Sequence, residues 1–245
     1  MFEFKNYNHQ KVELFITNDG STSLFVPAIN ETYHSHKGAI KESKFVYLQE
    51  GLCKVVKNEE TNIFEFGFGT GLNALLVLDY CMLNQNQKIN YTTVEKFPIS
   101  IEIANELNYH KFLNNNDLED IFQQLHTFTW NEKHNLIQNF CFKKWQLEFL
   151  ETPVDANSQD IIFYDAFAPS KQKEVWTVPY LKKCFQMLKT NAFLVTYCAN
   201  GQFKRTLLDI GFEVETLPGP MGKKEIIRAW KIGTRTFDQN ILQQK

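Results

Sequence analysis

The chain has 245 residues, of which 43% are hydrophobic and 22% are charged, and its formal net charge is −2. This composition is ordinary for a globular protein, and the length fits one large α/β domain with a modest extension. A net charge this close to zero excludes a global basic field that would draw the protein onto nucleic acid, so any RNA contact must come from a local patch.

Cysteine usage and the apolar segments indicate the compartment. The five cysteines are scattered and include no Cys-x-x-Cys pair, which favours reduced thiols over a disulfide framework or a zinc site. The longest apolar runs are far too short for a membrane span, and the first residues lack the basic-then-apolar layout of a secretion signal. We therefore expect a cytoplasmic protein without membrane contact.

The first sixty residues predict an extension that precedes the main domain. Residues 11–27 alternate in hydrophobicity around Asn18-Asp19-Gly20, which is typical of a β-hairpin with a tight turn. After a polar stretch, apolar residues recur at helical spacing from Glu42 to Val55. The expectation is that residues 1–60 form a hairpin and a helix that pack on the main domain.

Residues 61–233 alternate between predicted strands and helices. The strands are expected at 63–66, 89–94, within 136–147, at 161–164 and at 193–197, and the helices at 72–83, 98–108, 117–125, 174–188 and 201–210. The last two strands, 212–217 and 225–231, are joined by a loop too short for a crossover helix, so they must be antiparallel. This order predicts a Rossmann-like α/β fold of the class I S-adenosylmethionine-dependent methyltransferases, with a mostly parallel seven-stranded sheet and one antiparallel strand. Residues 234–245 predict a polar tail.

A glycine-rich turn, Glu65-Phe-Gly67-Phe-Gly69-Thr-Gly71, joins the first strand of this domain to its first helix. Glycines permit positive φ and a close approach of the backbone to a ligand. A dinucleotide fingerprint requires a glycine three residues after Gly69, where this chain has Leu72, so a nucleoside–amino acid ligand such as S-adenosylmethionine is favoured over a pyrophosphate. A tight turn without a ligand is the alternative that the turn alone leaves open.

Two acids stand where such a ligand needs them. Glu65 is predicted to hold the ammonium group of the methionine part, directly or through water. Glu95 ends the next strand, where the acids of dinucleotide folds accept hydrogen bonds from ribose hydroxyls. We therefore expect S-adenosyl-L-methionine to contact Glu65, Gly67, Phe68, Gly69, Thr70, Gly71, Asn73, Glu95 and Lys96.

The segment from Asp160 to Lys171 predicts a buried strand that ends in an acid, followed by an aromatic residue and a proline. In a doubly wound sheet, ligands bind outside the carboxyl ends of the strands, so Asp165 is expected to face the reacting group. A carboxylate there can accept the N–H bonds of an amine, direct its lone pair toward a sulfonium methyl group and stabilise the charge that grows on nitrogen. Phe167 would offer a face to a planar base, and Pro169 would stiffen the loop. A turn-capping role for Asp165 and a core position for Phe167 are the alternatives.

Five blocks of the sequence carry a resemblance to a known family. They are Glu31-Thr-Tyr33-His34-Ser35 with Gly38-Ala39, residues 65–73, Val94-Glu95-Lys96-Phe97-Pro98, residues 165–177 and residues 218–229. On these blocks the chain resembles the tRNA 5-(aminomethyl)-2-thiouridine methyltransferase family, which comprises the methyltransferase half of MnmC and the stand-alone MnmD. The resemblance implies transfer of a methyl group from S-adenosyl-L-methionine to the amine of 5-aminomethyl-(2-thio)uridine at the tRNA wobble position. It also implies a tRNA partner and no flavin, because the oxidoreductase domain of the bifunctional members has no counterpart in this chain.

Further substrate contacts follow from the same resemblance. The block that matches the family places Tyr33, His34 and Ser35, together with Glu31, near the amine pocket. The other expected substrate contacts are Phe167 and Pro169 in the acid segment and Lys171, Lys223 and Lys224 in loops at the carboxyl face of the sheet. A basic rim for the tRNA backbone is expected to gather Lys171, Lys173, Lys204, Arg205, Lys223, Lys224 and Arg228. No metal site is expected, because His34 and His36 have no acid or cysteine partner at ligand spacing. The chain departs from the family at Lys171-Gln172-Lys173, where a proline is usual, and residues 145–151 offer no recognisable adenine contact.

Two other functions are compatible with the sequence. An aminopropyltransferase of the spermidine-synthase type also moves an alkyl group from a sulfonium to an amine, although its glycine turn usually carries Gly-Asp where Thr70-Gly71 stands here. A non-catalytic RNA-binding protein on the same scaffold is the second, and the three acids Glu65, Glu95 and Asp165 argue against it. The sequence predicts no oligomeric state.

Overall fold

The computed structural model describes residues 4–5, 11–56, 58–115, 117–220, 222 and 225–233. The predicted tail 234–245 and the two lysines Lys223 and Lys224 lie outside these residues. None of the helices in the described ranges is long and apolar enough to cross a membrane.

The amino-terminal part forms a small antiparallel sheet of four strands in the order β1-β2-β3-β4. Its strands are β1 (Phe4–Lys5), β2 (Lys11–Ile16), β3 (Thr22–Val26) and β4 (Glu31–Thr32). The predicted hairpin is confirmed as β2 and β3. Its turn is held by Asp19, whose Oδ1 accepts hydrogen bonds from the Thr17 hydroxyl at 2.7 Å and from the Ser21 N–H at 3.1 Å.

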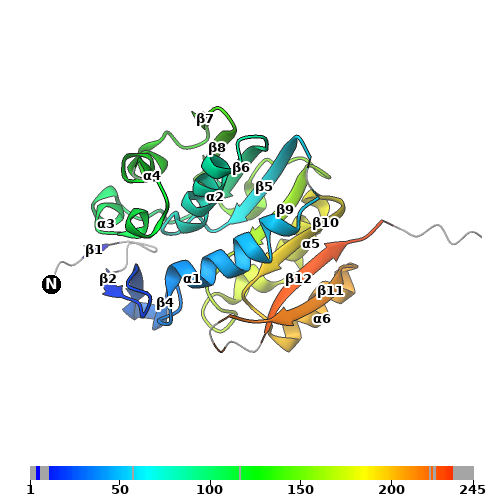
Figure 1. Cartoon of the computed structure of the whole chain (residues 1–245). Coiled ribbons are helices and arrows are strands. Elements are labelled where there is room, and N and C mark those ends of the chain that lie inside the picture. Colours follow the sequence, from blue (N-terminus) through cyan, green and yellow to red (C-terminus); the bar gives the residue numbers. More distant parts are fainter. Residues whose placement is uncertain are drawn as a thin grey trace, which may run out of the picture.

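The predicted helix after this sheet is present but is not one regular α-helix. It starts as α1 (Ala39–Ser43), widens to a π-helix over residues 44–49 and ends in a 3₁₀ turn over residues 52–54. The wider turn is visible in the bond from the Glu50 N–H to the Phe45 carbonyl, five residues back, at 2.9 Å. Gly51 permits the tight ending, because a Cβ there would stand 2.2 Å from the Tyr47 carbonyl oxygen. In Figure 1 this helical run crosses in front of the main sheet.

The main sheet has eight strands in the order β11-β12-β10-β9-β5-β6-β8-β7. They are β5 (Glu60–Phe66), β6 (Lys88–Val94), β7 (Lys133–Ile137), β8 (Phe140–Trp145), β9 (Gln159–Tyr164), β10 (Leu188–Thr196), β11 (Glu213–Pro218) and β12 (Glu225–Lys231). As predicted, β12 runs antiparallel to both of its neighbours, β10 and β11. The seven strands of the class I fold are therefore present.

An eighth strand lies at the edge of this sheet. Instead of one strand within residues 136–147, the chain forms the antiparallel hairpin of β7 and β8. The extra strand escaped the sequence pattern because no residue of β7 is fully buried, so the strand shows no alternation of buried apolar residues.

Helices cover both faces of the main sheet, and alternation along β9 shows how the two cores are separated. Ile161 and Phe163 belong to the core under α1 and α2 (Leu72–Leu83), whereas Ile162 and Tyr164 belong to the core under α5 (Val178–Met187) and α6 (Gly201–Ile210). Successive strand residues point to opposite faces, so a strand buried on both sides reads as one continuous apolar run. Beyond α2, α3 (Ile101–Asn105) packs on α4 (Leu118–Thr127) (Figure 1).

Two predicted helices are shorter than expected. The helix predicted at 98–108 is reduced to α3, which begins after Ser100, whose hydroxyl accepts from the Ile103 N–H. The helix predicted at 174–188 begins as a 3₁₀ turn at 173–176, and α5 then starts at Val178 with Pro179 in its first turn. Proline lacks an N–H and suits only the start of a helix, which explains this boundary.

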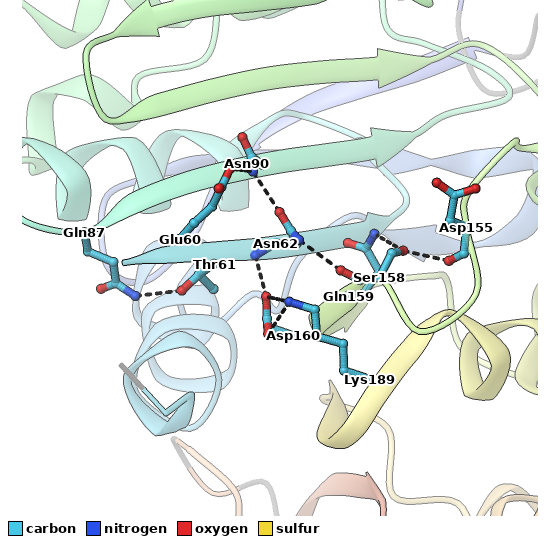
Figure 2. A network of polar contacts seen from close by, with 10 residues as sticks. All are labelled: Glu60, Thr61, Asn62, Gln87, Asn90, Asp155, Ser158, Gln159, Asp160 and Lys189. Atoms are coloured by element: carbon cyan, nitrogen blue, oxygen red, sulfur yellow. Dashed lines mark hydrogen bonds and ion pairs between the residues drawn. The ribbon is translucent and has the colours of Figure 1, made fainter. Parts of the chain in front are cut away.

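A polar network joins the strands at their amino ends (Figure 2). The Asp160 carboxylate accepts from the Asn62 N–H at 2.8 Å and binds the Lys189 ammonium at 2.8 Å, and it is 8% exposed. The Asn90 side chain donates to the Asn62 side chain at 2.8 Å across the β5–β6 pair. These bonds hold the register of β5, β6 and β9 at the amino ends of the strands. The candidate site lies at the other edge of the sheet, at their carboxyl ends.

Candidate active site

The glycine-rich turn draws together the carboxyl ends of three neighbouring strands. The N–H groups of Gly67 and Phe68 donate to the Val94 carbonyl at the end of β6, at 3.1 and 3.2 Å. Gly67 has φ +88°, and a Cβ there would stand 2.3 Å from the Asp165 carbonyl oxygen, just after β9. Only glycine fits this position. Glycine is therefore required at this position both by the positive φ and by the close contact with the residue after β9.

The turn forms one wall of a cavity of about 270 Å³ at the carboxyl edge of the sheet. The predicted cofactor residues that line this cavity are Gly67, Phe68, Gly69, Thr70, Asn73, Glu95 and Lys96. Other residues that line it are Leu147, Glu148 and Phe149, after β8, and Tyr180 on α5. From β5 the chain continues to β6 on one side of β5, and it later adds β9 on the other side. The cavity therefore lies at the point where the strand order reverses, which is where such folds bind ligands.

Glu95 links the glycine turn to the end of β6. Its two carboxylate oxygens accept hydrogen bonds from the Gly69 N–H at 2.9 Å and from the Phe97 N–H at 2.8 Å. Burial raises the pKa of Glu95, and the backbone N–H groups act in the opposite direction. The Glu95 side chain thus lines the cavity and also supports the turn, and its contact with the ribose stays a prediction.

Asp165 lies just after β9, in the walls of two cavities at once. Its Oδ2 accepts a hydrogen bond from the Asn73 side chain at 2.8 Å, and its backbone N–H donates to the Phe66 carbonyl at 3.1 Å. These bonds position the carboxylate from α2 and from β5. Asn73, predicted as a cofactor contact, therefore also orients the predicted catalytic acid.

The loop after Asp165 is fixed by side-chain bonds. The Phe167 N–H donates to the Gln172 side chain at 3.2 Å, and the Trp176 indole N–H donates to the Phe167 carbonyl at 2.8 Å. The Phe167 ring meets the Tyr33 ring edge to face, with centroids 5.0 Å apart. Tyr33, which directly follows β4, thereby adds an aromatic ring to the lining of the first cavity.

The second cavity, of about 220 Å³, lies between the amino-terminal part and the carboxyl edge of the main sheet. Its walls include the predicted substrate residues Glu31, Tyr33, His34 and Ser35. The remaining walls include Glu42, Ser43, Tyr47, Asp165, Ala168 and Tyr197. The residues that line both cavities are Thr32, Tyr33, His34, Asp165 and Tyr197, so the two spaces meet beside the predicted catalytic acid.

Glu65 does not line either cavity. Its side chain is fully buried, and neither carboxylate oxygen has a hydrogen-bond partner of good geometry among the described residues. Burial raises the pKa of Glu65 to about 8, against a smaller opposing effect of the nearby Thr93 hydroxyl. The structure therefore encloses Glu65 near the end of β5, and its predicted contact with the cofactor ammonium stays a prediction.

Other predicted contacts lie away from the two cavities. Gly71 begins α2 with φ +75° and, like Pro169 and Lys171, does not line them. The expectation that Arg228 belongs to a basic rim is wrong, because its side chain is 8% exposed and pairs with Glu50 at 3.4 Å and Glu215 at 3.1 Å. Arg228 is thus occupied by two partly exposed acids and is not available to the phosphate backbone.

Lys204 is also a weaker candidate for the rim than its sequence position indicates. Its ammonium pairs with the Glu225 carboxylate at 2.6 Å, across the contact between α6 and β12. Arg205 donates to the Gln202 side chain at 2.9 Å on the same helix. Lys171 and Lys173 are half-buried and exposed, respectively, in the loop after Asp165.

Several lining residues were missed from the sequence. Tyr197 directly follows β10, and the segment 147–149 follows β8, so the rule that strand ends carry ligands would have found them. Glu42 and Tyr47 lie on the amino-terminal helical run, and no sequence pattern relates a face of that helix to the end of a distant strand. The positions of these two residues could therefore not be predicted from the sequence.

Comparison with known proteins agrees with this geometry. A family model described as S-adenosyl-L-methionine-dependent methyltransferase matches residues 116–232. The tRNA 5-methylaminomethyl-2-thiouridine biosynthesis bifunctional protein MnmC of Cupriavidus metallidurans is 26% identical over 229 residues, which cover 89% of this chain and 33% of the relative. The protein of the same name from Campylobacter hominis is 28% identical over 211 residues, covering 84% and 31%. The chain thus spans about a third of the length of these relatives.

Solved structures show the same fold. MNMC2 from Aquifex aeolicus superposes with a TM-score of 0.72 at 24% identity, covering 90% of this chain and 70% of the other. Spermidine synthase from Thermotoga maritima superposes with a TM-score of 0.56 at 12% identity, covering 94% and 72%. At such identities the likeness establishes the architecture and leaves the reaction open.

Proposed function

Because the chain is an S-adenosyl-L-methionine-dependent methyltransferase of the family that includes the methyltransferase part of MnmC, we propose that it methylates an amine on tRNA. The acceptor that we infer is the aminomethyl group of 5-aminomethyl-(2-thio)uridine at the wobble position, and the product is 5-methylaminomethyl-(2-thio)uridine. The observation that carries this proposal is the position of Asp165 between the cavity beside the glycine turn and the second cavity.

The chemistry of the transfer explains why an acid is needed at that point. The sulfonium of S-adenosylmethionine is already an activated methyl donor, so what the protein must supply is an unprotonated amine in line behind the methyl group. Asp165 accepts the amine N–H bonds, aims the lone pair and stabilises the positive charge that develops on nitrogen. Asn73 holds the carboxylate in place for this role, through its bond to Oδ2 at 2.8 Å.

The residues of the first cavity suit the cofactor. The backbone of the glycine turn admits the methionine part closely, and Glu95 faces the ribose hydroxyls from the end of β6. We infer that the adenine lies beside residues 147–149, which line the same cavity. Phe167 and Tyr33 stand toward the acceptor, where aromatic faces can stack on a base.

Replacing Glu95 by alanine is expected to weaken S-adenosylmethionine binding about a hundredfold. The change removes the ribose acceptor and also releases the Gly69 N–H that Glu95 now binds at 2.9 Å, so both the ligand contact and the turn are lost. Isothermal titration with S-adenosylhomocysteine measures the affinity. Glu95→Gln is the matched variant, because it retains an acceptor but loses the charge. Its affinity for S-adenosylhomocysteine should lie between those of the unchanged protein and Glu95→Ala. Equal affinity of all three proteins would remove Glu95 from the cofactor site.

Charge reversal at Lys223 and Lys224 is expected to weaken tRNA binding about tenfold, with unchanged affinity for S-adenosylhomocysteine. Two lost phosphate contacts should also lower the slope of log affinity against log salt by about two. The control is Lys133→Glu on the exposed edge strand β7, at the other end of the sheet. Filter binding over a series of salt concentrations gives both quantities. An unchanged slope would show that these lysines do not meet the phosphate backbone.

The proposed reaction is tested by incubating the protein with methyl-labelled S-adenosylmethionine and tRNA from cells that lack this modification. Nucleoside analysis should recover the label as 5-methylaminomethyl-(2-thio)uridine. Label in another nucleoside, or none in RNA, would contradict the proposal.

The acids of the second cavity give one reason to consider an aminopropyltransferase as the second candidate. Glu31, Glu42 and Asp165 are the kind of groups that hold a polyamine. A parallel incubation with putrescine and decarboxylated S-adenosylmethionine separates the two reactions, and we expect no spermidine from it.

A further inference from the structure

The last turn of α4 contacts the glycine-rich turn at Thr70. The Nε2 atom of His126 lies 3.2 Å from the Thr70 carbonyl oxygen. A carbonyl oxygen only accepts hydrogen bonds, so this ring nitrogen must carry the proton and donate. Burial, and after it the charge of Lys144, lowers the pKa of His126 to about 3, so the ring is uncharged at neutral pH. The imidazole therefore offers one N–H donor, and the glycine turn receives it.

His126 comes this close because residue 71 is a glycine. A Cβ at Gly71 would stand 3.0 Å from the imidazole Nε2 and 3.0 Å from the Phe68 ring. The Phe68 ring, which lines the first cavity, also packs on the imidazole, with centroids 5.1 Å apart. The last glycine of the turn does not line that cavity, and the space beside it is used by the imidazole instead.

Lys144 on β8 fixes the end of α4, and with it His126. Its side chain is fully buried, and its ammonium donates to the carbonyls of Leu125 and His126 at 2.9 and 2.6 Å. These carbonyls belong to the last turn of α4, where the helix itself offers no N–H partner. The ammonium also stands 4.4 Å from the centre of the Trp130 ring. The position of the imidazole is thus set by bonds to the main sheet.

Thr70 is held at its side chain as well. The Tyr109 hydroxyl donates to the Thr70 hydroxyl at 3.1 Å, and the Tyr109 ring packs edge to face on Phe122 of α4. Thr70 is buried and lines the first cavity. The Tyr109 bond fixes the side chain but does not fix the peptide that follows it. The bond from His126 acts on that peptide directly, at its carbonyl oxygen.

A glycine allows the peptide before it to reverse. Rotation of the peptide between Thr70 and Gly71 changes φ of Gly71, and glycine tolerates both signs of φ. In the observed orientation the Gly71 N–H donates to the Phe68 carbonyl at 2.8 Å, and the Thr70 carbonyl accepts from His126. Both bonds would be lost in the reversed orientation. The shape of the turn beside the cavity therefore depends on them.

We propose that His126 is a positioning residue of the cofactor site, which selects the orientation of the Thr70–Gly71 peptide that admits S-adenosyl-L-methionine. It acts through the Thr70 carbonyl, because the imidazole does not line the cavity itself. This inference rests on the proposed place of the cofactor beside the glycine turn, and it does not depend on the acceptor. A turn that adopts the competent orientation only part of the time binds its ligand more weakly in proportion to that fraction.

The test compares two substitutions that differ in the donor. His126→Leu fills the space beside Phe68 but donates nothing, so S-adenosylhomocysteine should bind about tenfold more weakly, the size expected for one lost hydrogen bond. His126→Gln should stay within about twofold of the unchanged protein, because its amide nitrogen can donate in place of Nε2. Gln123→Leu, at an exposed position of α4, controls for the apolar change. Equal affinity of His126→Leu and the unchanged protein in isothermal titration would overturn the proposal.

The number of binding sites distinguishes positioning from a loss of folded protein. A partly unfolded sample binds at fewer sites with unchanged affinity, whereas a misaligned turn keeps one site per chain and lowers the affinity. In a methyl-transfer assay, His126→Leu should raise the KM for S-adenosyl-L-methionine about tenfold and change kcat at saturating cofactor less than about twofold. A fall in kcat at unchanged KM would overturn the proposal.

The tautomer of His126 gives a measurement that does not depend on binding. NMR of the imidazole nitrogens at neutral pH should show the proton on Nε2, with His126→Gln identifying the signal, and a proton on Nδ1 alone would overturn the proposal.

The Glu95→Ala protein separates this inference from the proposed cofactor site. Weaker binding of S-adenosylhomocysteine to Glu95→Ala but not to His126→Leu would refute the role of His126 and leave the cofactor site standing. Unchanged binding to both variants would refute both. Weaker binding to His126→Leu, together with a failure to methylate tRNA, would refute the proposed reaction and support the role of His126.

Discussion

Replacing Asp165 by alanine should lower kcat by about a thousandfold while leaving the affinity for S-adenosylhomocysteine within about twofold of the unchanged protein. The carboxylate lies where the two cavities meet, so its removal takes away the group that orients the amine and stabilises its growing charge. The cofactor cavity keeps its glycine turn and Glu95. Single-turnover rates with saturating tRNA, together with a calorimetric titration of the cofactor product, measure the two quantities.

Two further variants make that result specific. Asp165→Asn keeps the shape and the bond from the Asn73 side chain but loses the charge, so it should lose most of the activity as well. Asp155→Ala removes an exposed acid a few residues before β9 and should be fully active. Turnover that survives in Asp165→Ala would mean that the amine is oriented by another group, and the proposed mechanism would be wrong.

Gly67→Ala is expected to abolish measurable cofactor binding and to lower stability. A Cβ at this position would stand 2.3 Å from the Asp165 carbonyl oxygen, and φ of +88° is strained for any residue with a side chain. The strain alone costs about 1–2 kcal/mol. Relief of the clash requires β5 and β9 to separate, which moves Asp165 and the turn together. Thermal unfolding and titration with S-adenosylhomocysteine measure both effects.

The matched control for this prediction is Gly201→Ala. Gly201 begins α6, and a Cβ there would meet its nearest neighbour, an Arg205 side-chain nitrogen, at an ordinary 3.7 Å. Alanine suits a helix better than glycine, so this protein should be as stable as the original or slightly more so. A Gly67→Ala protein that binds the cofactor as well as Gly201→Ala does would show that the close approach of the turn to β9 is not needed.

The architecture could be predicted because its signals are local and strong. Short continuous apolar runs such as residues 161–164 are typical of strands covered on both faces, and the short loop before β12 forces an antiparallel end to the sheet. Where the prediction was incomplete, the missing signal was weak for a physical reason. The edge strand β7 has no fully buried residue, and the helical run after α1 widens to a π-helix over residues 44–49 before it ends at Gly51.

The candidate site divides along the same line. The residues that follow strands, such as Gly67, Glu95 and Asp165, could be assigned to one edge of the sheet from sequence order alone. Glu42 and Tyr47 could not, because they reach that edge from a separate layer whose orientation depends on packing. The burial of single side chains could not be predicted from the sequence either. Arg228 was expected at the surface, but its side chain is buried and pairs with Glu50 and Glu215. Glu65 was expected to contact the cofactor, but its side chain is fully buried.

The most direct measurement is a crystal structure with sinefungin, an S-adenosylmethionine analogue whose primary amine replaces the transferable methyl group. If Asp165 holds an incoming nitrogen behind the methyl donor, the analogue will fill the cavity beside the glycine turn. Its amine will then lie about 3 Å from the Asp165 carboxylate. An analogue bound elsewhere, or an Asp165 side chain directed away from that amine, would contradict the central claim.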